Sequence, residues 1–214
     1  MITVKINGEE RQYPQGATYE DVANDYQQEY ENLIALAARD GKIRELFKKL
    51  TRDCEVTFFT LKDDVGNKTY VRSATMLFLK AVFDVYGREA AQSCRVEFAI
   101  GNGSYISPKE KINATEENAA KIRNRMRELV EAKTPFLKRS YSLDNAMELF
   151  RKEGMKDKEK LFRYRRGSFV NIYEMDGYYD YYYGYMLPNA GYVKWFDVIA
   201  YEDCLLYTSD AADE

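Results

Sequence analysis

The chain has 214 residues, with 32 Lys and Arg against 35 Asp and Glu and a formal net charge of −3. This balance creates no global field that would draw the chain to nucleic acid or to an anionic membrane surface, and no apolar run approaches the ~18 residues of a membrane span. The sequence contains no histidine, which excludes Ser-His-Asp and Cys-His nucleophiles, helical His-Glu-x-x-His zinc sites and any imidazole general base.

Other catalytic motifs are missing from the sequence as well. No Cys-x-x-Cys replaces histidine as a metal site, and Gly101–Tyr105 lacks the lysine and the spacing of a phosphate-binding loop. Cys54 and Cys94 form an isolated pair in a chain whose N-terminus has no apolar signal region. Such a pair is typical of reduced thiols, so we expect a cytoplasmic protein without membrane contact. The sequence therefore offers no recognisable catalytic constellation, metal site or cofactor site, although carboxylate-only chemistry stays open.

The first residues predict a β-hairpin. Ile2, Val4 and Ile6 alternate with polar residues, as in a half-buried strand. Asn7-Gly8 follows, and both residues tolerate the positive φ of a tight turn. We therefore expect Glu9–Tyr13 to be the return strand.

A helix and three more strands are predicted next. Thr18, with Asp21 three residues later, forms a capping-box pattern. It opens a helix with Tyr19, Val22, Ala23 and Tyr26 on one face. Strands are expected at Leu33–Ala38, Lys42–Leu46 and Glu55–Phe59, with Asp40-Gly41 as the turn between the first two. A hairpin, a helix and then further strands is the order of a β-grasp fold.

The segment ITVKINGEERQYPQGATYEDVA resembles the TGS domain, the ubiquitin-like module at the front of threonyl-tRNA synthetases and some GTPases. The matching signals are the strand-Asn-Gly-strand, the Pro-x-Gly-x-Thr entry and the helix that follows. The resemblance implies a regulatory module associated with a ligand or RNA in residues 1–62, and no active site. A domain that only packs against its neighbour is the alternative.

Residues 63–203 predict a second domain of the α+β class. The polar, turn-prone stretch Asp63–Asn67 is the expected boundary. Ser73 is expected to cap a helix that carries Leu77, Ala81, Val82 and Val85 and stops at Gly87. Further helices are expected from Asn113 or Thr115 to about Lys133 and at Leu143–Glu153, and strands at Cys94–Ile100, Phe169–Tyr173 and Tyr192–Ile199.

This stretch resembles the second additional domain that follows TGS in threonyl-tRNA synthetases and recurs in alanyl-tRNA editing proteins. In that family a helix with H-x-x-x-H and a later strand with Cys and His form the editing or metal pocket. Here Arg72 and Met76 fall at the two His positions and Tyr173 at the Cys position, and the last His has no counterpart. Arginine and methionine cannot replace two neutral imidazoles on Zn²⁺. The resemblance therefore implies the fold without the metal and without the hydrolytic activity.

One helix is a candidate RNA contact. Its basic residues are Lys121, Arg123, Arg125 and Arg127. Acidic residues flank them, so the alternative is a solvated face with i,i+4 ion pairs.

A tyrosine-rich tract covers residues 173–192. Aromatic rings beside basic residues can stack on the bases of a single strand. The candidates for stacking on a base, a nucleoside or a nucleotide are Tyr178, Tyr179, Tyr181 and Tyr183. Packing within a sheet or an intrachain interface is the alternative.

The whole of residues 1–203 resembles the N-terminal half of long bacterial uridine (nucleoside) kinase-like proteins, most specifically in the run Asp176–Pro188. The resemblance implies a regulatory or binding half whose partner, a P-loop kinase domain that uses ATP and Mg²⁺, is missing. No kinase residue is present. An RNA- or small-ligand-binding module derived from synthetase appendages is the alternative, and a truncated threonyl-tRNA synthetase is the third.

The last residues, Cys204–Glu214 (CLLYTSDAADE), resemble the in-frame translation of a transposon-end adapter from sequencing libraries. We therefore expect the natural chain to continue past Asp203, and residues 204–214 to form a non-native tail that finds no packing partner. A native acidic disordered tail is the alternative. Without Asp210, Asp213 and Glu214, acidic and basic residues balance at 32 each.

Overall fold

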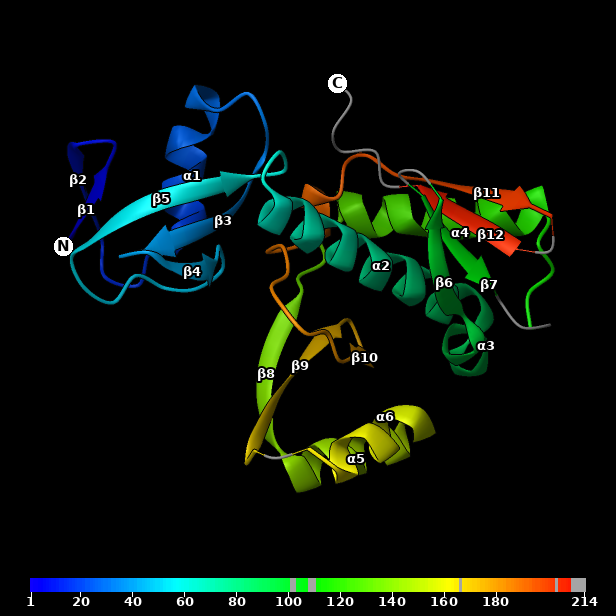
Figure 1. Cartoon of the computed structure of the whole chain (residues 1–214). Helices are drawn as coiled ribbons and strands as arrows, with labels where there is room; N and C mark the ends of the chain where they lie inside the picture. Colours follow the sequence, from blue (N-terminus) through cyan, green and yellow to red (C-terminus); the bar gives the residue numbers. More distant parts are fainter. Residues whose placement is uncertain (101–102, 108–110, 166, 203, 209–214) are drawn as a thin grey trace. The chain divides into compact units, whose positions relative to one another are not determined.

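The computed structural model describes residues 1–100, 103–107, 111–165, 167–202 and 204–208. They form two compact units (Figure 1). The first unit consists of Met1–Ser73 and Gly184–Pro188, and the second of the described parts of Ala74–Tyr183 and Asn189–Asp210. The chain passes from one unit to the other inside helix α2 (Asp64–Tyr86). The domain ranges 1–62 and 63–203 remain a prediction from sequence.

A mixed five-stranded sheet forms the first unit, with the strand order β2-β1-β5-β3-β4. β1 pairs antiparallel with β2 and parallel with β5, and helix α1 packs against β3. The elements are β1 (Ile2–Ile6), β2 (Glu9–Tyr13), α1 (Tyr19–Tyr26), the 3-10 turn η1 (Gln27–Glu29), β3 (Ile34–Arg39), β4 (Lys42–Glu45) and β5 (Cys54–Thr60). The predicted β-grasp order is confirmed.

The hairpin turn and the helix cap have the predicted chemistry. Asn7 and Gly8 have φ values of 52° and 88°, the positive values that a tight hairpin turn requires. The Thr18 hydroxyl accepts the backbone N–H of Asp21 at 3.2 Å, and the Asp21 carboxylate accepts the N–H of Thr18 at 2.7 Å. This capping box fixes the start of α1, whose buried face is the predicted set Tyr19, Val22, Ala23 and Tyr26.

Helix α2 begins at Asp64, so the cap expected at Ser73 and the loop expected at Asp63–Asn67 are wrong. The start is set by the preceding turn, where the Thr60 N–H donates to the Asp63 carboxylate at 2.7 Å. A Cβ at Gly66 would stand 1.9 Å from the Thr60 carbonyl oxygen, so this close approach needs glycine.

Ser73 lies inside α2 and donates to the carbonyl oxygen of Thr69 at 2.8 Å, which satisfies its buried hydroxyl within the helix. Gly87, with a φ of 85°, follows the last residue of the helix as predicted. Val85, expected on the apolar face, is 36% exposed. Among the described residues, no helix combines the length and the apolar character needed to cross a membrane.

The second unit contains an antiparallel sheet with the order β11-β12-β7-β6, and helix α4 packs against β11. Thr115 caps α4 as predicted, and Ala119, Ile122, Met126 and Leu129 are its buried residues. The elements are α3 (Arg88–Ser93), β6 (Arg95–Ile100), β7 (Gly103–Ser107), α4 (Glu116–Glu131), the 3-10 turn η2 (Ala190–Tyr192), β11 (Asp197–Tyr201) and β12 (Cys204–Thr208). The strand expected at Tyr192–Ile199 is therefore wrong in its first half.

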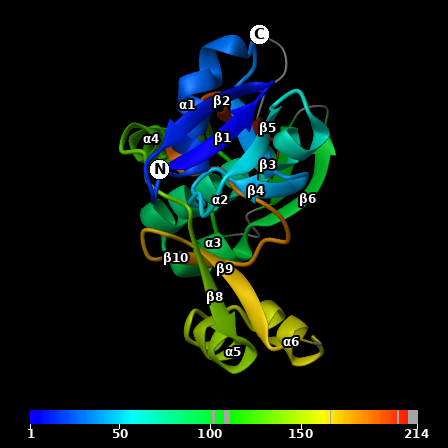
Figure 2. The same ribbon diagram turned by 90° about the vertical axis from the view of Figure 1, so that its left-hand side faces the viewer.

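A long hairpin extends from the rest of the second unit and carries two helices at its end (Figure 2). Strands β8 (Leu137–Ser142), β9 (Phe169–Met175) and β10 (Tyr178–Asp180) form an antiparallel sheet in the order β10-β9-β8. Helices α5 (Leu143–Lys152) and α6 (Lys156–Arg163) lie between β8 and β9 in the chain and pack on each other. Ser142 caps α5 as predicted.

The expectation that the tail lacks a packing partner is wrong for Cys204–Thr208. These residues form β12, which pairs with both β11 and β7 and so lies inside the sheet. Cys204, Leu205 and Tyr207 are at most 1% exposed. An apolar, strand-forming segment fills a position that would otherwise leave two strand edges unpaired. The resemblance of these residues to an adapter stays a prediction.

Candidate functional site

Arg72 is held by a loop of the first unit. Its Nη1 donates to the carbonyl oxygen of Tyr185 at 2.6 Å. Gly184 has a φ of 132°, and a Cβ there would lie 2.6 Å from Cζ of Arg72. The loop is anchored further where Ser73 accepts the Leu187 N–H at 2.9 Å. Arg72 is thus engaged with its own chain, at a position that the family resemblance gives to a metal-binding histidine.

Met76 and Tyr173, the other two positions that the family resemblance gives to metal ligands, are each fully buried in the second unit. The Tyr173 ring lies 5.3 Å from the Lys138 ammonium and 6.5 Å from the Tyr182 ring. A thioether and an enclosed phenol ring are packing groups. Neither side chain offers the neutral nitrogen that a zinc site of this kind uses.

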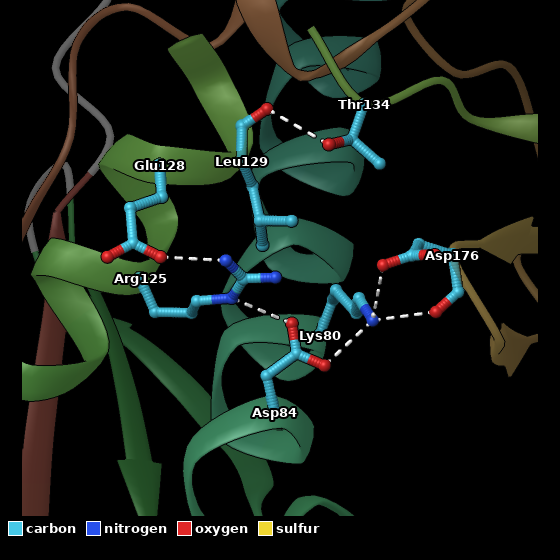
Figure 3. Close-up of polar contacts among 7 residues, drawn as sticks. All are labelled: Lys80, Asp84, Arg125, Glu128, Leu129, Thr134 and Asp176. Carbon is cyan, nitrogen blue, oxygen red and sulfur yellow. Dashed lines mark hydrogen bonds and ion pairs between the residues drawn. The ribbon is translucent and has the colours of Figure 1, made fainter. Parts of the chain in front are cut away.

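Lys80, one helical turn after Met76, is a buried lysine at the centre of a charge network (Figure 3). Its side chain is 3% exposed, and its Nζ lies 2.7 Å from Asp84 Oδ1. It also donates to the carbonyl oxygen of Asp176 at 2.7 Å and lies 3.3 Å from the carboxylate of Asp176. Asp84 also forms an ion pair with Arg125, with 2.9 Å between Asp84 Oδ2 and Arg125 Nε. The network therefore connects α2, α4 and the β9–β10 turn.

Sequence reasoning missed Lys80. The available signal was a charged pair, Lys80 and Asp84, at i,i+4 within an otherwise apolar stretch of helix. A buried lysine is stabilised only by close partners. Here the partners are Asp84, on the same helix, and Asp176, which no sequence pattern places near Lys80. The Asp176-Gly177 turn, with φ values of 44° and 80°, places its carbonyl at the ammonium.

Three of the four basic residues predicted for RNA on α4 form ion pairs with the chain itself. Lys121 pairs with Glu117 at 2.7 Å. Arg123 lies 3.1 Å from Glu116 and 3.0 Å from Asp197, and Arg125 pairs with Asp84 and Glu128 at 2.9 and 2.7 Å. Arg127 is exposed and has no ion-pair partner among the described residues. The geometry resembles the solvated, ion-paired face given as the alternative, and RNA contact by α4 stays a prediction.

The four candidate tyrosines lie in different environments. Tyr178 is 4% exposed and donates to Asp180 at 3.3 Å, and burial raises the pKa of its phenol. Tyr179 is half-buried, and burial together with the charge of Glu174 raises its pKa. Tyr181 accepts from Arg165 Nη1 at 2.5 Å. Tyr183 is 87% exposed and is the most exposed of the four.

A cavity of about 340 Å³ lies beside Tyr178 in the second unit. Lys158 and Asp180 form an ion pair in its wall, and the Asp180 carboxylate also accepts the N–H of Tyr181 at 2.5 Å. Burial lowers the pKa of Lys158 to about 8 and raises that of the Cys94 thiol to about 12. The Lys158 ammonium is therefore engaged by Asp180, and the Cys94 thiol stays protonated at neutral pH.

Within the described residues, no cluster of three or more cysteine or carboxylate side chains is placed to hold a metal ion. The expectation that the chain binds no zinc stays a prediction, because it concerns the protein in solution.

The chain is similar over most of its length to threonine--tRNA ligases. The protein of Thermotoga maritima is 29% identical over 205 residues, which are 93% of this chain and 30% of that protein. Those of Porphyromonas gingivalis and Maricaulis maris are 25% and 27% identical over 201 and 193 residues. No family model matches the chain.

The similarity lies in the N-terminal region of these relatives, which contains the TGS domain and the second additional domain. The chain spans about 30% of the length of the curated relatives it matches. The α+β fold, with a mixed five-stranded sheet and separate antiparallel sheets, agrees with this region.

Proposed function

We propose that the chain is a non-hydrolytic RNA-binding module, derived from the N-terminal region of a threonine--tRNA ligase. One observation carries the proposal. The three positions that the family resemblance assigns to a metal-dependent pocket hold Arg72, bound to the Tyr185 carbonyl, and Met76 and Tyr173, both fully buried. These side chains stabilise the fold without providing a metal ligand set or a base for water.

Without a hydrolytic pocket, binding of RNA is the role that the relatives support best. Their name states an action on tRNA, and their similarity to this chain covers 93% and 91% of it. The chain as a whole carries a net charge of −3, so RNA binding needs a local basic surface, since phosphate contacts supply most of the affinity. Helix α6 and its C-cap residue Tyr164 provide such a surface.

The test is direct binding of the intact chain to tRNA, measured by fluorescence anisotropy at several salt concentrations. The proposal predicts saturable binding whose log Kd rises linearly with log salt, because counterions are released from each contacted phosphate. Absence of binding at low salt would contradict RNA recognition. Salt-independent binding would contradict the phosphate-based mode.

A regulatory half of a nucleoside kinase is the second candidate. The run Asp176–Pro188 favours it, since this run carries the most specific part of that resemblance. The threonine--tRNA ligases described above support the RNA-binding proposal better. Sequencing the natural gene beyond codon 203 tests the kinase proposal. A downstream G-x-x-x-x-G-K-[ST] loop after an apolar strand supports an ATP- and Mg²⁺-dependent domain, and an early stop codon contradicts it.

A further inference from the structure

Helix α6 presents a face of basic and aromatic side chains to solvent. Lys156, Lys160 and Tyr164 follow each other at intervals of four residues, so they lie on one face of the helix and its C-cap. All three are exposed, and Tyr164 is 87% exposed. Arg163 lies beside them and is also exposed. We call these four residues the α6 face.

The acidic residues of the same helix leave the charges of Lys156 and Lys160 unpaired. Between residues 156 and 165, five Lys and Arg stand against two Asp and Glu. Glu159 is 13% exposed on its side chain and pairs with Arg151 and Arg163, and Asp157 lies in the first turn, where a carboxylate stabilises the helix dipole. Lys156 and Lys160 have no ion-pair partner in the part of the chain that the structure describes. The α6 face is therefore basic although the chain is acidic overall.

A ring stack holds the α6 face in place. The rings of Phe150 on α5 and Phe162 on α6 stack 5.3 Å apart at 4°, and Phe162 meets Tyr181 edge-on at 5.0 Å. Arg165 lies 5.4 Å from the Tyr181 ring and donates to its hydroxyl. Because these contacts fix the helix on its inner side, the outward residues are preorganised, which lowers the entropy lost when a ligand binds.

We propose that the α6 face binds a single-stranded segment of RNA, with phosphates at Lys156 and Lys160 and an unpaired base stacked on Tyr164. Four residues of α-helix advance about 6 Å, close to the distance between successive phosphates of an extended strand. Exposed aromatic rings beside basic residues are the usual elements of single-strand binding. This inference rests on the proposed function and specifies its surface.

An anionic membrane is the competing partner for a basic helix, and the geometry disfavours it. Interfacial helices insert a continuous apolar face. Helix α6 has only eight residues, and its largest apolar ring, Phe162, is 1% exposed within the protein. Leu161 and Tyr164 alone are left to insert. The electrostatics of the α6 face therefore fit a phosphodiester strand better than a bilayer.

The test compares variants of the full chain for binding to a fluorescent ten-nucleotide single-stranded RNA, to a duplex of the same length and to tRNA. Lys156→Gln/Lys160→Gln is expected to weaken single-strand binding about tenfold and to reduce the log–log salt slope by about 1.4, since each lost phosphate contact of a single strand contributes about 0.7. Tyr164→Ala is expected to raise Kd about tenfold, the loss of one stacked base, whereas Tyr164→Phe keeps the ring and the affinity.

Two further variants separate the outcomes. Lys5→Gln/Lys42→Gln removes the same charge from exposed positions on β1 and β4 and is expected to leave Kd unchanged. Lys121→Gln/Arg127→Gln tests the α4 surface. If wild type binds RNA and only the α4 variant loses affinity, the inference about α6 is overturned while the proposed function stands. If wild type binds anionic phosphatidylserine vesicles and no RNA, both are overturned.

Discussion

Lys80 and Asp84 form an ion pair of 2.7 Å across one turn of α2, with the lysine side chain 3% exposed. Asp84 is shared with Arg125 of α4, and Lys80 with the carbonyl of Asp176 (Figure 3). Removing the partner of a buried charge lowers the free energy of unfolding far more than removing the partner of an exposed charge, because the buried charge stays desolvated. This pair therefore ties two helices and a hairpin turn into one unit.

Replacing Lys80 should lower stability strongly. We expect Lys80→Ala to reduce the free energy of unfolding by about 3 kcal/mol, since it removes a buried side chain together with its packing and its bonds to Asp84 and Asp176. Lys121→Ala is the matched control, because it also breaks an i,i+4 ion pair, yet at an exposed site. It should cost less than about 0.5 kcal/mol. Urea unfolding measures both, and equal losses would contradict the importance of burial.

Gly184 should resist substitution because of Arg72. A Cβ at Gly184 meets the Arg72 guanidinium carbon at 2.6 Å, and the φ of 132° is strained for any other residue. We expect Gly184→Ala to destabilise by about 2 kcal/mol. Gly16 has a φ of 94° and no atom within 4 Å of an added Cβ. The loss of stability in Gly16→Ala therefore measures the cost of backbone strain alone. In the Gly184→Ala background, Arg72→Ala should recover some stability. If it recovers none, the guanidinium does not crowd Gly184.

The buried ammonium of Lys158 should give stability a pH dependence. Burial lowers its pKa from 10.5 to about 8, while Asp157 acts in the opposite direction. Between these values the unfolded chain binds more protons than the folded one, so the contribution of Lys158 to stability increases as the pH rises from about 8 to about 10.5. Below pH 8 both states are protonated, and the contribution is constant.

Comparison with Lys158→Met isolates this effect, because titrating groups that do not contact Lys158 cancel in the difference and its partner Asp180 is a carboxylate, which titrates at lower pH. The unfolding free energy of wild type minus that of the variant should be flat from pH 6 to 7.5 and should rise from pH 8.5 to 10. A difference that stays constant over the whole range would show that Lys158 keeps its ordinary pKa.

Truncation after residue 203 distinguishes two expectations about the C-terminal residues. Strand β12 buries Cys204, Leu205 and Tyr207 between β7 and β11, so its loss should lower stability by several kcal/mol, at about 1.5–3 kcal/mol for each large buried side chain. An adapter-derived tail without packing would leave the unfolding midpoint unchanged. Chemical denaturation of the two chains, with matched buffer and concentration, decides between them.

The first unit could be predicted from sequence because its signals are local. Asn7-Gly8 and Thr18 with Asp21 determine a turn and a cap through neighbouring atoms alone. The start of α2 was predicted wrongly because Ser73 has the side chain of a cap, whereas the Thr60–Asp63 turn sets the start.

The rest of the candidate site depends on contacts between distant residues. Helix α6 contains mostly charged residues, so apolar periodicity gave no signal for it. Its position follows from the Phe150–Phe162–Tyr181 stack. Lys80 acquires its partners only when the chain brings residue 176 to α2. Arg72, Met76 and Tyr173 were singled out only through the family resemblance.

The rate of hydrolysis of mischarged tRNA, measured with the chain in excess of its Kd for tRNA, tests the central claim most directly. We expect all tRNA to be bound while the ester is hydrolysed at the rate of the protein-free control, with and without added Zn²⁺. Faster hydrolysis that is abolished by Arg72→Ala would contradict it, because the substituted pocket would then be an active site.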